Sequence, residues 1–355
     1  MTIRFDNGNT KIVTNDARVT ISTSGVSGNG VLSVGSGTIE ATSGVGTVRV
    51  TLIWDSSAVA TSFDINIIDA SALDLTLRPY PSYTGSSSVQ TNELKEIENT
   101  GKYQRAKAEV ILTLSDGTTH DVSTSSTVTT SDANVVEITE PNKILSTEGM
   151  SAVGSFATIG AQFGTLLATS NQTLAVSGNK ALVTDLSFST FSSDTLSLIV
   201  DRSTYLSVRV TFDDATVFEN ARTSTSSWIS ITEYLSFASS KPSLATIDSF
   251  GSVTVKSNSD KDQVSVNVTS LNTYTSYAFD TNLLADVGDV DVGAVVGSPY
   301  PVNLQSGDTF SVSVRANTNQ ALKQFEIYLQ FDDNVLRAVS VSTGSDWSPY
   351  VQSSS

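Results

Sequence analysis

The 355-residue sequence contains no cysteine. This absence excludes disulfide frameworks, thiolate metal sites and thiol catalysis, and with them the antibody type of immunoglobulin domain, whose two sheets are joined by a disulfide. It leaves the cellular compartment open, because disulfides follow the redox environment and the size of a domain rather than secretion alone.

Histidine is nearly absent too, with His120 as the single residue. A Ser-His-Asp triad therefore has only one place to form, and no Gly-x-Ser-x-Gly segment accompanies it. His120 follows a Ser-Asp-Gly-Thr-Thr turn, so we interpret it as an ordinary exposed or half-buried side chain. We expect no enzyme.

Basic residues are few, with 20 Lys and Arg against 36 Asp and Glu, which gives a net charge of −16. Nucleic acids and anionic membrane surfaces require clustered positive charge, so we expect neither as a partner. No apolar run approaches the roughly 18 residues of a membrane span, and no membrane contact is predicted within this sequence. Hydrophobic residues make up 39%, which is enough for packed cores and excludes a wholly disordered chain.

Both ends of the sequence look like interrupted strand patterns. Residues 1–5 enter a strand pattern directly, without the basic and apolar regions of a signal peptide. Residues 352–355 follow a strand pattern that lacks a closing partner. We expect an internal piece of a longer chain, with its signal and anchor elsewhere.

The segment 239–255 predicts a β-hairpin with one buried face. Ala245 and Ile247 fall on the same side of an extended strand. Residues 248–251 (Asp-Ser-Phe-Gly) supply turn chemistry, because Gly251 is free to adopt a positive φ. Two valines then resume the apolar face, so both strands of the hairpin contribute to a core.

Two landmarks recur in the same order along the chain. One is an alternating strand that runs into a turn, and its last apolar residue is Phe5, Leu114 or Phe212. The other is the hairpin, with equivalent positions at Val34, Ile138 and Ile247. Successive copies lie roughly 100 residues apart, which indicates tandem copies of one module. Many short strands separated by turns are typical of a β-sandwich.

The hairpin segment Pro-Ser-Leu-Ala-Thr-Ile-Asp, followed by Gly-Ser-Val-Thr, resembles the signature of the bacterial Ig-like group 2 domain. The resemblance covers roughly residues 1–283 and implies an all-β fold of tandem Ig-like β-sandwich domains. The expected boundaries are 1–62 for an N-terminally truncated domain and 63–178 and 179–284 for two further domains.

The character of the sequence changes after residue 285. Phe310, Val312 and Val314 alternate with polar residues, and a second alternating run, 325–331, leads into Asp-Asp-Asn-Val-Leu at 332–336. This pattern resembles part of a cohesin-like module, a further β-sandwich, so 285–355 is predicted to be a C-terminally truncated cohesin-like module. Together with Asn-Thr-Gly-Lys-Tyr-Gln-Arg-Ala before a Ser-Asp-Gly turn, the arrangement is similar to ectodomains of the transmembrane protein 132 family, which implies cell adhesion.

One acidic cluster has two open interpretations. Asp286, Asp289 and Asp291 lie within six residues at an expected module boundary. Calcium takes oxygen ligands from loops of this kind, but the spacing differs from an EF-hand, so a solvated linker stays the alternative. The acidic pairs at 213–214 and 332–333 are interpreted as turn residues rather than as a glycosidase pair. No other cofactor is expected.

Two sequons begin at Asn171 and Asn267, and they predict glycosylation if the source is a secreting eukaryote. Asn267 falls opposite core positions of its strand, so we expect it to face solvent.

Leu94 and Ile97 have helical spacing, and either a helical turn capped by Gly101 or an irregular strand fits them.

The sequence favours a structural or adhesive extracellular protein at the cell surface or in a filament, acting as a stiff spacer. Its expected partners are other copies of itself or neighbouring modules, and cell-surface glycans or proteins. The alternative is a set of carbohydrate-binding or cohesin-type scaffold modules, with exposed aromatic side chains as the binding groups: Tyr80, Tyr83, Trp347 and Tyr350, with Trp228 and Tyr234 as a poorer pair.

Overall fold

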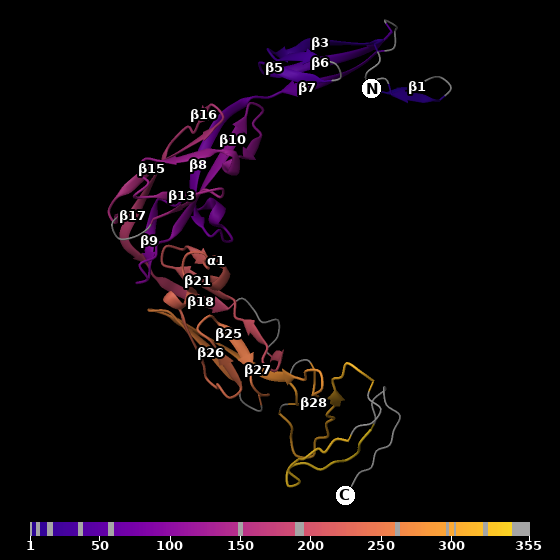
Figure 1. Ribbon diagram of the computed structural model, residues 1–355, viewed down its shortest axis with the longest axis vertical. Coiled ribbons are helices and arrows are strands. Elements are labelled where there is room, and N and C mark those ends of the chain that lie inside the picture. Colours follow the sequence, from indigo (N-terminus) through magenta and orange to yellow (C-terminus); the bar gives the residue numbers. More distant parts are fainter. Residues whose placement is uncertain are drawn as a thin grey trace.

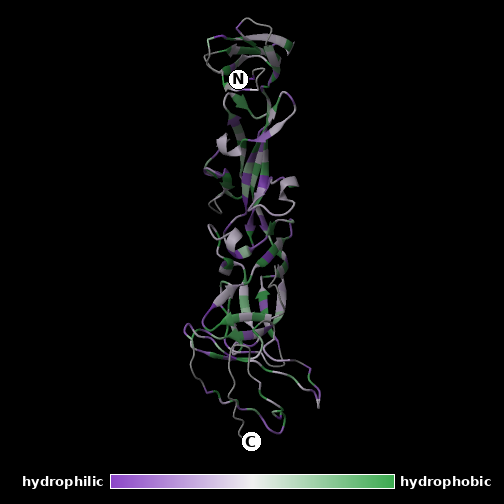
Figure 2. Cartoon of the chain, turned by 90° about the vertical axis from the view of Figure 1, so that its right-hand side faces the viewer, coloured by the Kyte–Doolittle hydropathy of each residue, from purple (hydrophilic) through white to green (hydrophobic). Residues whose placement is uncertain are grey.

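The computed structural model describes residues 2–4, 8–12, 17–34, 38–55, 60–147, 152–188, 195–259, 263–295, 298–301, 303–321 and 326–342. The all-β fold of tandem Ig-like β-sandwiches is confirmed, with sheets that follow one another along an elongated chain (Figure 1). Three hydrophobic cores succeed each other in chain order. A second view, turned by 90° and coloured by hydropathy, shows hydrophobic residues on the strands of the successive sheets (Figure 2).

The first module comprises strands β1 to β7: β1 (Thr2–Arg4), β2 (Thr10–Ile12), β3 (Val19–Gly28), β4 (Val31–Val34), β5 (Ile39–Ser43), β6 (Gly46–Trp54) and β7 (Ala60–Ile67). β3, β6 and β7 form one antiparallel sheet, and β4 and β5 form a hairpin. Ile65 and Ile67 were expected in the second module. They pack in the first core instead, because β7 pairs with β6 along its whole length.

The second module comprises β8 to β17: β8 (Ala70–Tyr80), β9 (Glu93–Ile97), β10 (Arg105–Leu114), β11 (Thr119–Asp121), β12 (Thr127–Thr130), β13 (Glu137–Thr139), β14 (Ile144–Ser146), β15 (Phe156–Phe163), β16 (Leu166–Leu167) and β17 (Gln172–Ala181). One sheet contains β8, β10, β11, β13 and β14, and the other contains β9, β12, β15, β16 and β17. Alternate side chains of β8 and β10 enter the core between the two sheets, where Leu73, Leu77 and Val110 are fully buried.

The third module comprises β18 to β27 and one helical turn: β18 (Val183–Phe188), β19 (Thr195–Ile199), β20 (Ser203–Tyr205), β21 (Val208–Phe212), β22 (Val217–Phe218), α1 (Ala221–Ser224), β23 (Ser236–Ser239), β24 (Ala245–Ile247), β25 (Ser252–Val255), β26 (Val264–Thr269) and β27 (Tyr274–Leu284). Its core is the largest of the three and includes the fully buried rings of Phe212 and Phe279.

The predicted hairpin is confirmed. β24 pairs with β25 in an antiparallel register that sets Ile247 opposite Val253, and Gly251 has a φ of 77°. Ile138 on β13 lies opposite Leu145 in the same way. Ile138 and Ile247 lie on the face of the hairpin that the sequence predicts to be buried, but both are only partly buried at the margin of their cores, while their cross-strand partners are fully buried.

Leu94 and Ile97 lie on a strand, so the helical alternative is wrong. β9 runs parallel to β17, and the register of this pair shifts between the two residues. Leu94 is fully buried in the core of the second module and Ile97 in the core of the third, and the register shift between them explains a spacing that resembles a helix.

Beyond the third module, the described residues form only one two-stranded sheet, β28 (Val290–Val292) with β29 (Val314–Ala316). The strand expected at 325–331 is absent from its described part, and the side chains of Tyr328, Leu329 and Phe331 are exposed. An alternating segment becomes a strand only when a neighbour pairs with its backbone, and the described residues offer this segment no such neighbour. The cohesin-like sandwich is therefore not supported.

Candidate functional site

A turn with the same hydrogen bonds follows β10 in the second module and β21 in the third. Asp116 Oδ1 accepts from the Thr118 backbone N at 2.9 Å and from Thr118 Oγ1 at 2.7 Å. Asp214 Oδ1 accepts from the equivalent atoms of Thr216 at 3.0 and 2.6 Å. The residue between them is left-handed in both turns. This is the landmark that the sequence pattern predicts, and an Asx-type turn explains why aspartate stands there.

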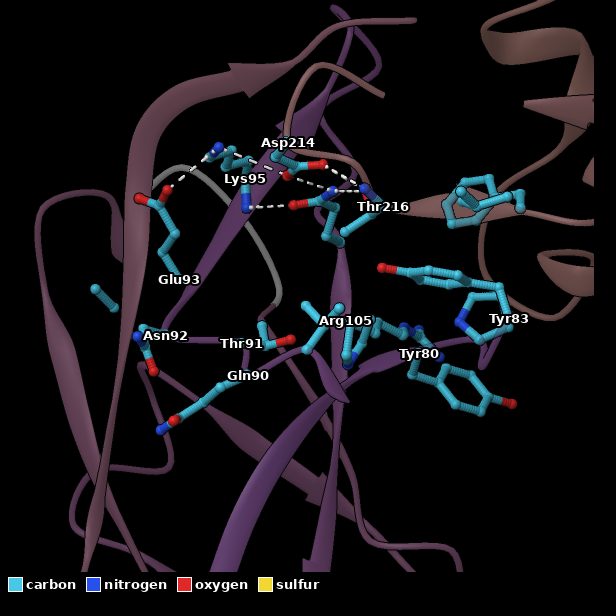
Figure 3. A pocket seen from close by; sticks show the side chains of 17 residues that line it. Tyr80, Tyr83, Gln90, Thr91, Asn92, Glu93, Lys95, Arg105, Asp214 and Thr216 are labelled. Atoms are coloured by element: carbon cyan, nitrogen blue, oxygen red, sulfur yellow. Dashed lines mark hydrogen bonds and ion pairs between the residues drawn. The ribbon is translucent and has the colours of Figure 1, made fainter. Parts of the chain in front are cut away.

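In the third module this turn docks against the second module. Gln104 Nε2 donates to Asp214 Oδ2 at 3.0 Å and to Thr216 Oγ1 at 2.7 Å. Lys95 Nζ lies 3.5 Å from Asp214 Oδ2 and 3.3 Å from a carboxylate oxygen of Glu93 (Figure 3). Both ends of the Lys95–Asp214 pair are mostly buried, so this pair is screened less by salt than an exposed one.

The charges of this contact support each other. Burial alone would raise the pKa of Asp214, but hydrogen bonds from Thr216 and Gln104 and the nearby Lys95 outweigh it and lower that pKa. Burial opposes the charge of Lys95, while Asp214 and Glu93 favour it, and its pKa is raised. Both side chains are therefore held in their charged forms. The neighbouring Asp213 accepts from the Leu182 backbone N at 3.2 Å. The pair 213–214 lies in a turn, as the sequence predicts, and it also contacts the Leu182 backbone and the second module.

Glu98 fastens the connection between the two modules. Its backbone N donates to the Ala181 carbonyl at 3.0 Å, and its Oε1 accepts from the Val183 backbone N at 2.8 Å. The side chain is buried, with 1% exposed. Lys180, beside it, contacts Glu96. No sequence pattern marks Glu98, since a carboxylate after a strand usually faces solvent and only the fold brings residue 183 to it.

A cavity of about 390 Å³ lies beside this contact, and we call it the junction cavity. Residues of both modules line it, including Tyr80, Tyr83 and Arg105 from the second and Phe218 from the third (Figure 3). The guanidinium of Arg105 lies 4.8 Å from the ring centroid of Trp228 in the third module. The structure thus brings together Tyr80 and Tyr83, two of the expected aromatic residues, at a place that no motif marked.

The other aromatic candidates lie apart from the cavity or beyond description. Tyr234 is buried in the third core, where burial raises its pKa. Trp347 and Tyr350 fall outside the described residues. His120 is exposed on β11, as expected.

The three acidic residues of the expected calcium site lie in and after a turn. The Asp286 backbone N donates to Asp289 Oδ2 at 3.2 Å, whereas Asp291 pairs with Arg315 across β28 and β29. Within the described part of the chain, no group of three potential metal-ligating side chains is gathered. Calcium binding there stays a prediction, and calorimetry with and without EDTA tests it.

Both sequon asparagines are exposed in the structure. Asn267 faces outward on β26, between the fully buried Val266 and Val268, as the alternation predicts. Glycosylation of Asn171 and Asn267 stays a prediction.

Comparison with known proteins finds no matching family model and no matching curated protein. Solved structures similar to the chain include domains 4–9 of the surface layer protein SbsC, with 10% identity, a TM-score of 0.33, and 82% of this chain and 43% of that chain covered. The I67–I69 fragment of titin gives 9%, 0.23, 76% and 89%, and the integrin-binding protein invasin gives 15%, 0.23, 76% and 52%. The chain spans about two fifths of the surface-layer chains.

These values are too low to transfer a function. Among the described residues, no helix is long and apolar enough to cross a membrane.

Proposed function

We propose that the chain is a non-enzymatic structural and adhesive part of an extracellular protein, in which tandem Ig-like modules act as a stiff spacer. The observation that carries this proposal is the docked contact between the second and third modules. The turn at Asp214 is held by Gln104 and Lys95, and Glu98 fastens the connecting chain on the other side. Two attachments on separate segments resist bending better than a single linker does.

The separate cores support the same proposal. Each module has a buried cluster, and the third cluster also includes Ile97 and Ala181 from the end of the second module. Modules in a row contact chiefly their neighbours, so length is added without one core common to the whole chain. A net charge of −16 keeps such a surface soluble and favours exposure to the medium. Within this proposal the modules are of the bacterial Ig-like group 2 type, and the partners are other copies of the chain or other cell-surface molecules.

Small-angle scattering of the full chain tests the spacer. A compact protein of this length has a radius of gyration of about 20 Å, and we expect a value well above it, with a rod-like distance distribution. A radius near that of the compact particle would contradict the proposal.

Antibody labelling of intact source cells tests the surface location, and labelling only after permeabilisation would contradict it.

A further inference from the structure

The junction cavity has the size and composition of a small-molecule site. Its volume of about 390 Å³ lies within the range of ligand pockets, roughly 300–1,000 Å³. Tyr80, Pro81 and Tyr83 form an aromatic and apolar wall, and the polar residues Thr91 and Asn92 line the side across from it (Figure 3). A wall of rings facing hydroxyl and amide groups suits a ligand that has both C–H faces and polar substituents.

The charges that line the cavity do not all cancel locally. Four charged residues line it, and three of them, Glu93, Lys95 and Asp214, pair with one another. Arg105 is the fourth, and no carboxylate among the described residues lies within ion-pair distance of it. Its guanidinium stacks on the ring of Trp228 instead. A stacked guanidinium keeps the N–H groups along its edge available.

The half-buried position of Arg105 makes this charge costly without an anion. Burial lowers the pKa of Arg105, although Tyr80 and Glu137 act in the opposite direction. Arginine stays protonated in proteins, so the cost is not relieved by loss of a proton. A carboxylate bound along the guanidinium edge relieves it by two parallel charge-assisted hydrogen bonds.

We propose that the junction cavity binds an acidic saccharide, with the sugar carboxylate on Arg105 and the sugar ring against Tyr80 and Tyr83. The hydroxyl of Thr91 and the amide of Asn92 meet the sugar hydroxyls. This site goes beyond the spacer proposed above, because it gives one joint of the rod a specific ligand. Both modules contribute to it, so an isolated module lacks a complete site.

Isothermal titration of the full chain with trigalacturonic acid, and with neutral α-1,4-linked galactotriose, which differs from it only at C6, tests the proposal. We expect the acidic trisaccharide to bind at least tenfold more tightly than the neutral one. Binding also changes tryptophan fluorescence, because Trp228 touches the guanidinium that receives the carboxylate. No binding of trigalacturonic acid at millimolar concentration, or equal binding of both sugars, overturns the proposal.

Two variants locate the site. Arg105→Gln reduces the affinity for trigalacturonic acid at least tenfold, whereas Arg202→Gln, at an exposed arginine outside the cavity, leaves it unchanged. Tyr83→Ala, on the aromatic wall, weakens binding without removing the charge, so it tests the site even if Arg105→Gln loosens the junction. Unchanged affinity in both cavity variants places the ligand elsewhere and overturns the assignment. The scattering test of the rod is independent of these results.

Discussion

The turns at Asp116 and Asp214 have the same internal hydrogen bonds but different surroundings. Asp116 is fully exposed, while the side chain of Asp214 is mostly buried and bound by Gln104 and Lys95 of the preceding module. The local sequence is therefore enough to form the turn. What the turn contacts depends on the residues that the neighbouring module presents. A repeated element can thus serve as a plain loop in one copy and as a docking group in the next.

The largest expected difference concerns the residue before each turn. Phe212→Ala removes a fully buried ring that packs edge-on against Phe218 at 4.9 Å, and we expect a loss of about 3–5 kcal/mol for the third module. Leu114→Ala, at a partly buried position, costs the second module less. Denaturant unfolding of the full chain, followed by a probe in each module, measures both losses. Equal losses would mean that the two positions are not packed as described.

The next difference concerns the aspartates themselves. Asp214→Ala removes the turn bonds and the contacts to Gln104 and Lys95, and hydrogen bonds to a charged group contribute about 1.5–3 kcal/mol. Asp116→Ala removes only turn bonds of an exposed group, so its effect is smaller. Scattering and calorimetry measure both effects, and each variant serves as the control for the other. If Asp116→Ala makes the junction between the second and third modules as flexible as Asp214→Ala does, the docked contact is not what stiffens that junction.

Glu98→Ala leaves the Val183 backbone N buried without a partner, which costs about 1–3 kcal/mol. We expect the unfolding of the second and third modules to separate into two transitions in calorimetry, because their connection is freed. Glu40→Ala, at an exposed position of the first module, provides the control. A single unshifted transition in Glu98→Ala would contradict the fastening role of this carboxylate.

The smallest expected effect is that of acid on the docked turn. The pKa of Asp214 is lower in the folded chain than in the unfolded chain, where it is about 3.9. Its contribution to stability is therefore complete above about pH 4 and is lost as the pH falls through the lowered value. Asp116 titrates in the same direction, but its protonation frees no neighbouring module.

Scattering between pH 6 and pH 3 should accordingly detect that the junction between the second and third modules is more flexible at pH 3. The Asp214→Asn variant should have this flexibility at both pH values. A wild-type curve that does not change before global unfolding would show that the ion pair contributes nothing to stiffness.

Those parts of the structure that depend on neighbouring residues in the sequence were predicted well. Alternation and turn chemistry located the hairpin at Ile247 and the turn after Phe212, since both form from a short segment. The contact of Gln104 with Asp214 joins residues 110 positions apart, and no periodicity encodes which side chain a neighbouring module presents. The strand expected near Phe331 failed for a related reason, because alternation describes one strand and not its pairing partner.

The parallel pairing of β9 with β17 has a mechanical consequence. β17 leads directly into the third module, and β9 lies alongside it, as β19 does with β27 one module later. A pull along the chain axis on the end of β17 loads the hydrogen bonds of this pair together in shear, rather than one after another as in unzipping. The second and third modules therefore each have a shear-resistant strand pair at the strand that leads out of the module, where tension enters.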